Sequence, residues 1–133
     1  TETRPAQPAP PPGLDSFLLT IWVPGLVPVS KANQRNHWAA VMRREREYAA
    51  KLWAALRRVA IRWRGPLSVT FHRAGAKQLD SDNLAGAYKK LRDVVAEWLG
   101  IDDGDTTAAS WGYTQEAASA RLLHGTRLTV SEV

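Results

Sequence analysis

The sequence predicts a small mixed α/β (α+β) domain, in which two helices cover a mixed β-sheet in the order β-α-β-α-β-β. Four short segments are rich in β-formers, two longer segments place apolar residues at helical spacing, and breaks rich in glycine or proline separate several of them. Residues 1–13 are rich in proline and alanine, so we expect a disordered tail. Residues 14–133 are enough for a single two-layer domain.

The first strand and the first helix are predicted in the N-terminal half. Residues 16–23, S-F-L-L-T-I-W-V, are rich in β-formers, and the Pro-Gly pair at 24–25 ends them. From about residue 34 to residue 60, apolar side chains recur at helical spacing and the other face is rich in arginine, which predicts a long amphipathic helix. The Gly-Pro pair at 65–66 breaks this pattern.

A second strand and a second helix follow. Residues 67–73 alternate between apolar and other side chains, as a half-buried strand does. The second helix starts near Ser81 or Asp82, either of which can cap it, and it runs to Leu99. Gly100 then ends it, because glycine readily adopts the left-handed conformation that closes helices.

Two more strands are predicted at the C-terminal end. They cover residues 108–115 and 121–131, and the small residues E-A-A-S-A between them predict a hairpin connection.

The composition excludes several classes of protein. The absence of cysteine excludes disulfides and thiolate metal sites and is consistent with a reducing compartment. No apolar run is long enough to span a membrane, and proline occupies the N-terminal region where a signal peptide would be apolar. We therefore expect a cytoplasmic protein without a membrane partner.

Charge is distributed unevenly along the chain. The net charge is +5 and the pI about 10.0. Residues 31–64 contain ten lysines and arginines against two acids, whereas residues 93–105 contain five acids and no base. A polyanion would be attracted to the first region. A solvated helix face explains the basic stretch equally well.

Two groups of carboxylates bracket the second helix. Asp80 and Asp82 stand at its entrance, and Asp102, Asp103 and Asp105 follow its end. Carboxylates drawn together repel by about 4 kcal/mol per pair at 4 Å and moderate dielectric, and a divalent cation would remove that repulsion. Taken separately, the first group can be a helix cap beside a loop aspartate, and the second can be a polar turn.

Oxygen ligands without cysteine favour Mg²⁺ or Mn²⁺. The three histidines are far apart in the sequence, and among them His37 lies in a segment that mixes phosphate-binding donors with an aromatic ring. Lys89 falls on the same face of the second helix as Asp82, where it could stabilise phosphate charge. An i, i+4 pair with Asp93 is the alternative role for this lysine.

These motifs resemble those of the RusA family of Holliday junction resolvases. The resemblance rests on D-S-D-N-L opening a helix, on Lys89 and Asp93 four residues apart within it, on the helix-ending L-G and on the D-D that follows. A P-x-S-x-x-N-like stretch at residues 27–33 adds to it, and the similarity extends from about residue 18 to residue 130. In the family the lysine usually follows the second aspartate by one helical turn, where this chain has Gly86.

The resemblance implies an endonuclease that resolves four-way DNA junctions in recombination and repair with Mg²⁺, or with Mn²⁺ as an equivalent ion. It implies that Asp80, Asp82 and Asp103 bind the metal, with Asp102 as the alternative to Asp103, and that Lys89 is the active-site lysine. It also implies a homodimer, whose two sites would suit a junction of two-fold symmetry.

Basic residues of the loop and the first helix would hold the DNA backbone. They are Lys31, Arg35, Arg43, Arg44 and Arg46. Two other functions stay open: a non-catalytic DNA-binding protein whose acidic cluster is a structural or vestigial metal site, and a metal-dependent nucleotide or sugar-phosphate enzyme. Small size and the basic charge disfavour the last.

Overall fold

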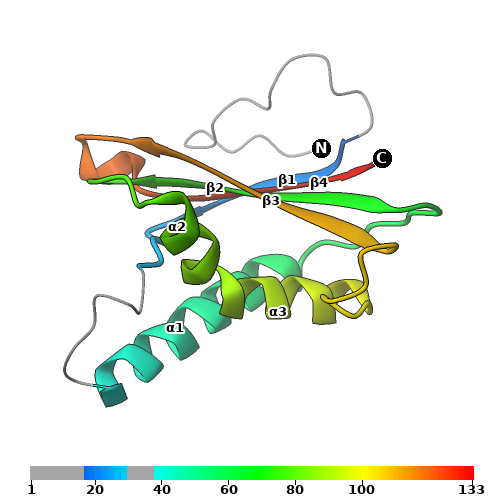
Figure 1. Cartoon of the computed structure of the whole chain (residues 1–133), viewed down its shortest axis with the longest axis horizontal. Coiled ribbons are helices and arrows are strands. Elements are labelled where there is room, and N and C mark those ends of the chain that lie inside the picture. The colour runs from blue at the N-terminus through cyan, green and yellow to red at the C-terminus, as the bar shows by residue number, and fades with distance from the viewer. Residues whose placement is uncertain (1–16, 30–37) are drawn as a thin grey trace.

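The computed structural model of the chain describes residues 17–29 and 38–133. In this part of the chain the predicted mixed fold class is confirmed, since a four-stranded mixed sheet carries its helices on one face (Figure 1). The predicted tail, residues 1–13, lies outside the described residues. None of the described helices has both the length and the apolar character needed to cross a membrane.

The elements follow one another in an order close to the predicted one. They are β1 (Phe17–Pro24), α1 (Trp38–Leu56), β2 (Leu67–Gly75), α2 (Ser81–Ala87), α3 (Lys89–Leu99), β3 (Ala109–Ala117), the 3-10 turn η2 (Arg121–Leu123) and β4 (Gly125–Glu132). The first helix ends four residues earlier than expected, because the chain tightens after Leu56, where the Val59 amide bonds to the Leu56 carbonyl at 3.0 Å. Its predicted start at residue 34 lies outside the described residues.

The second predicted helix is two helices. Tyr88 separates them with φ −95° and ψ 3°, and Figure 1 shows α2 and α3 meeting at an angle. The ring of Tyr88 is fully buried and stacks on Phe71 at 4.9 Å between centroids, so core packing overrides the helical periodicity here. The expected cap was also wrong, since the N-cap is Asp80, whose side chain makes no capping hydrogen bond.

The order of the strands corrects the expected hairpin. The sheet runs β1-β4-β2-β3, so β3 and β4 are not neighbours. β3 pairs in parallel with β2, from Leu67↔Ala109 to Gly75↔Ala117, while β4 lies antiparallel between β1 and β2. A parallel pair needs a long crossover, and α2 with α3 supplies it. Residues 121–123, expected to be strand, form η2 instead.

The core lies between the sheet and the helices. The predicted apolar side of β2 is confirmed, because Leu67, Val69 and Phe71 are fully buried. They belong to one apolar cluster with Leu52 of α1 and Val95 of α3. Residues on the helix-facing side of β2 and β3 therefore come close to the side chains of the crossover helices, and this is where the candidate site lies.

Candidate functional site

The loop that leads from β2 to Asp80 is clamped to β3 by one side chain. Gln115 accepts a hydrogen bond from the Leu79 amide at 2.8 Å and donates one to the Leu79 carbonyl at 2.6 Å. Two bonds from one amide to one residue fix both its position and its orientation. The residue before Asp80 is thus tied to the strand on the edge of the sheet.

Arg73 also binds the loop that leads from β2 to Asp80. Its side chain is 4% exposed, and it donates to the Pro28 carbonyl through Nε and to the Lys77 carbonyl through Nη1, each at 2.8 Å. Burial lowers the pKa of the Arg73 guanidinium. Gly75 leaves room for it, since a Cβ there would lie 2.7 Å from Nη1. This arginine joins the loop after β1 to the loop that carries the first acidic group.

Asp80 and Asp82 lie at the N-terminus of α2, and both are exposed. The side chain of Asp80 makes no capping hydrogen bond to α2. Both carboxylates are exposed, so water or a cation can reach them.

A hollow lies beside the junction of α2 and α3, and we call it the Asp103 hollow. Its volume is about 330 Å³. It is lined by Ala85, Gly86, Lys89, Arg92, Asp103 and Tyr113. Two of these side chains are cationic and one is a carboxylate, so the hollow combines donors for a phosphate with a ligand for a metal.

Arg92 makes the closest contacts to the Asp103 turn. It donates through Nη2 to the Asp103 carbonyl at 2.7 Å, and its Nε lies 3.4 Å from Asp103 Oδ2. The guanidinium also lies over the ring of Trp111, 5.1 Å from the centroid. Its Nε is buried without a hydrogen-bond partner, which leaves the Asp103 carboxylate as its nearest anion. Arg92 thus links α3, β3 and the turn.

The geometry separates the roles of the three aspartates after α3. The carboxylate of Asp102 accepts the Gly104 amide at 2.9 Å, and that of Asp105 accepts the Thr107 amide at 2.9 Å together with the Thr107 hydroxyl. These hydrogen bonds to Thr107 lower the pKa of Asp105. Asp102 and Asp105 therefore shape the turn, and Asp103 is the aspartate that lines the hollow.

Asp93 lies on α3 close to Asp103. Burial first, and then the charge of Asp103 and a hydrogen bond with it, raise the pKa of Asp93, against the opposing charges of Lys90 and Lys89. Lys89 lines the Asp103 hollow instead of forming an ion pair with Asp93 among the described residues. The sequence motif had indicated neither the proximity of Asp93 to Asp103 nor its effect on the pKa.

The predicted carboxylates are not all gathered at one point. In residues 17–29 and 38–133, no three acidic or histidine side chains come close enough to one another to hold a metal ion. Asp103 lies in the hollow with Lys89, whereas Asp80 and Asp82 do not line it. Among the residues that line the hollow, Asp103 is the one carboxylate and lies beside two cations, so this lining does not by itself form a divalent-metal site.

The predicted DNA-binding residues divide into two groups. Lys31 and Arg35 lie outside the described residues, as does His37. Arg43, Arg44 and Arg46 are exposed on α1.

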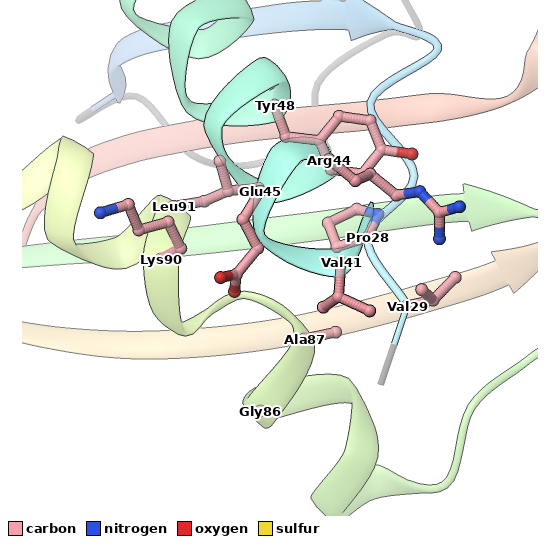
Figure 2. Close-up of a pocket in the computed structure, with 10 residues that line it drawn as sticks. All are labelled: Pro28, Val29, Val41, Arg44, Glu45, Tyr48, Gly86, Ala87, Lys90 and Leu91. Carbon is pink, nitrogen blue, oxygen red and sulfur yellow. The ribbon is translucent and has the colours of Figure 1, made fainter. Parts of the chain in front are cut away.

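A second cleft lies between α1, the loop after β1 and the α2–α3 junction. Figure 2 shows Arg44 extending its guanidinium towards the loop that carries Pro28 and Val29, while Lys90 extends away from it on the α3 side. Tyr48 donates to the Val27 carbonyl at 3.2 Å and so holds that loop to α1. Its lining combines apolar side chains with the charged side chains of Arg44, Glu45 and Lys90.

The other two histidines, His72 and His124, lie within hydrogen-bonding distance of neighbouring groups. His72 contacts Thr114 Oγ1 through Nδ1 at 2.6 Å and Glu116 through Nε2 at 2.8 Å. Side chains alternate along a strand, so His72 lies on the opposite face of the sheet from Phe71 and the helices. His124 contacts the Ala118 carbonyl at 2.7 Å through Nε2. Neither belongs to the Asp103 hollow.

Arg92, Trp111 and Gln115 are residues of the site that sequence reasoning missed. Arg92 lies three positions after Lys89, so it shares one face of the helix with this lysine, and that spacing was the available signal. Trp111 and Gln115 belong to β3, and only the pairing of β3 with β2 brings them to the loop and the turn.

The site therefore consists of two carboxylates at the start of α2 and a hollow that holds Lys89, Arg92 and Asp103. No known protein-family model matches the chain, and no curated protein matches it either.

Proposed function

We propose that this chain is a Mg²⁺-dependent endonuclease that cuts branched DNA, specifically the four-way junctions of recombination and repair. The observation that carries the proposal is the Asp103 hollow, where two cations and a carboxylate meet beside the helix that begins with Asp80 and Asp82. The motifs that resemble the RusA family supply the substrate class.

The residues present suit phosphodiester hydrolysis. Lys89 and Arg92 can donate to the non-bridging oxygens of a phosphate, whose negative charge increases as the scissile bond breaks. The resemblance assigns a Mg²⁺ or Mn²⁺ ion to Asp80, Asp82 and Asp103, where it would activate water and neutralise charge on the phosphate, although these three carboxylates do not converge on one point in the described structure. Tyr113 also lines the hollow.

The charge of the whole chain supports a nucleic-acid substrate. The net charge is +5, and Arg43, Arg44 and Arg46 project from an exposed face of α1. Backbone phosphates are the expected partners of such arginines. The proposed place of action is the cytoplasm, where bacterial DNA lies.

Two subunits are proposed to act together. A four-way junction has approximate two-fold symmetry and must be cut on two strands, so a symmetric dimer would present two hollows to two phosphates. Sedimentation velocity at micromolar concentration, with and without junction DNA, should give the mass of a dimer. A monomer under both conditions would overturn the dimer and leave the chemistry of a single site intact.

Cleavage of a labelled synthetic junction tests the function. With Mg²⁺ we expect paired nicks on the four-way junction and none on a matched linear duplex, and EDTA should abolish them. Asp82→Asn and Asp103→Asn should each lower the rate by at least 100-fold while leaving junction binding intact, because each removes a ligand charge. Asp102→Asn is the matched control, because the Asp102 carboxylate is used by its own turn.

A second function is supported by one observation. Because no three acidic or histidine side chains of the described residues converge, the chain could be a DNA-binding protein with a structural or vestigial metal site. Binding of the junction without nicks in any divalent cation would favour this alternative. Cleavage of a free nucleotide with none of DNA would instead favour a nucleotide enzyme.

A further inference from the structure

Trp38 differs from the other tryptophans of the chain in its exposure. All six tryptophans lie in the described part of the chain. Five of them are buried or packed against the core, namely Trp22, Trp53, Trp63, Trp98 and Trp111. Trp38, in contrast, is 76% exposed. Its large aromatic ring is therefore available to a partner outside the core.

Trp38 is the first residue of α1, at the end of the helix that lies away from the sheet (Figure 1). Val41 and Glu45 follow it by three and seven residues, so the three side chains share one face of the helix. Val41 and Glu45 line the cleft between α1 and the α2–α3 junction (Figure 2). Trp38 therefore lies on the face of α1 that forms one wall of this cleft, about one turn before Val41.

The side chains that surround Trp38 on α1 suit a nucleic acid. Arg43, Arg44 and Arg46 are exposed on the following turns, and they are the arginines proposed to bind backbone phosphates. An aromatic ring beside arginines is the combination that binds single-stranded nucleic acid, because the ring stacks on a base and the cations hold the backbone. A nucleobase is uncharged and can lie on the same helix face as Glu45, whereas a phosphate would be repelled there.

We infer that Trp38 is a stacking platform for an unpaired base of a DNA strand. This inference rests on the proposed function, from which it takes DNA as the substrate. Every base has an aromatic face, so stacking on an indole tolerates any sequence. Removing a base from the stack of a linear duplex costs free energy, and the cost is least for a base that is already unpaired. Trp38 therefore adds affinity for single-stranded or opened DNA over a matched linear duplex.

DNA binding in EDTA tests the inference without metal or cleavage. Fluorescence anisotropy with a labelled oligothymidylate should show affinity weakened about 5- to 100-fold in Trp38→Ala, the range expected when one base loses its stacking partner. Trp38→Phe should lie between this variant and the wild type, because phenylalanine keeps an aromatic face of smaller area. Leu122→Ala removes a similarly exposed apolar side chain, 90% exposed on η2, and should bind as the wild type does.

The salt dependence separates stacking from charge. Trp38 carries no charge, so Trp38→Ala should lower the affinity at every salt concentration and leave the slope of log K against log salt unchanged. Replacement of Arg43, Arg44 and Arg46 should instead lower that slope. A lower slope in Trp38→Ala would overturn stacking and show that loss of the ring acts through the arginines.

Stacking also has a spectroscopic signature. Tryptophan fluorescence of the wild type should fall when unlabelled oligothymidylate binds, because a stacked base quenches an indole. The same titration of Trp38→Phe should show little quenching although this variant still binds. Thermal unfolding checks that both variants are folded, as expected for the replacement of an exposed side chain.

The outcomes distinguish this inference from the function on which it rests. Equal affinity for oligothymidylate in Trp38→Ala and the wild type overturns the inference, whether or not the junction is cut. If Trp38→Ala then also sediments as a monomer where the wild type is a dimer, Trp38 is a contact between subunits. Stacking on Trp38 without cleavage of the junction in Mg²⁺ overturns the proposed function and leaves the platform standing. A wild type that binds no DNA overturns both.

Discussion

A chain of hydrogen bonds joins three buried groups at the helix break. The Thr126 hydroxyl donates to the Leu26 carbonyl at 2.6 Å, so the Tyr88 hydroxyl, also 2.6 Å from Thr126 Oγ1, is the donor in that second bond. Tyr88 and Thr126 are both 0% exposed. Because both hydroxyl groups are hydrogen-bonded, the polar side chain of Tyr88 can be buried in the core.

Replacing Tyr88 by phenylalanine should lower the free energy of unfolding by about 1 kcal/mol at pH 7, because Thr126 loses a buried donor. Burial raises the pKa of Tyr88 well above its usual value of 10.0. The unfolded tyrosine ionises above about pH 10 while the folded one stays protonated, so the wild type loses stability as pH rises beyond that point.

Urea unfolding at pH 7 and at several values above pH 10 measures this effect. The decline in stability should be shallower in Tyr88→Phe than in the wild type, since this variant has no group at position 88 to ionise. Parallel declines in the two proteins would assign the pH dependence to other groups.

At the scale of elements, α2 and α3 end for different physical reasons. The break at Tyr88 comes from packing, whereas the end of α3 is a local motif. Gly100 has φ 75°, and its amide bonds to the Glu97 carbonyl at 3.1 Å, while the Ile101 amide bonds to the Ala96 carbonyl at 2.9 Å. This pattern is the Schellman motif. It turns the chain directly towards the acidic turn.

Two glycines of this crossover should respond oppositely to alanine. Gly100→Ala should lower the free energy of unfolding by about 1 kcal/mol, because alanine is strained at positive φ. Gly86→Ala should raise it by up to about 1 kcal/mol, since Gly86 lies inside α2 and a Cβ there meets no atom within 4 Å. Chemical denaturation of both variants measures the pair. A loss of stability in both would show that the α2 position is constrained by something other than its local space.

On the scale of the whole molecule, cationic and acidic surfaces come from different elements. The exposed Arg43, Arg44 and Arg46 lie on α1, while the two acidic groups lie at the start of α2 and after α3. A DNA backbone held by the first group would be brought towards the second only if a metal compensates the carboxylates. Binding and cleavage should therefore respond to different mutations.

The triple variant Arg43→Gln, Arg44→Gln, Arg46→Gln should bind junction DNA more weakly and with less salt dependence. Each lost phosphate contact lowers the slope of log K against log salt by about 0.9, so the slope should fall by up to about 2.7. Fluorescence anisotropy from low to moderate salt measures this slope. The control replaces Arg58, Arg62 and Arg64, exposed beyond α1, and thus makes the same change in net charge. Equal slopes for the two triple variants would show that the α1 arginines affect DNA binding only through the net charge of the protein.

Local patterns were sufficient for the fold class, the approximate bounds of the elements and the glycine that ends α3. These features depend on periodicity and on backbone preferences, which act between residues close in sequence. The same reasoning identified Asp80, Asp82, Asp103 and Lys89 as candidates, and their roles stay predictions.

Only the tertiary structure decided which distant segments meet. The parallel pairing of β3 with β2 places Trp111 below Arg92, and core packing of Tyr88 divides the second helix. The difference between Asp102 and Asp103 arises in the same way, because it depends on an arginine eleven residues earlier. Such contacts cannot be predicted from spacing, since their free energy depends on burial and on partners that the fold brings together.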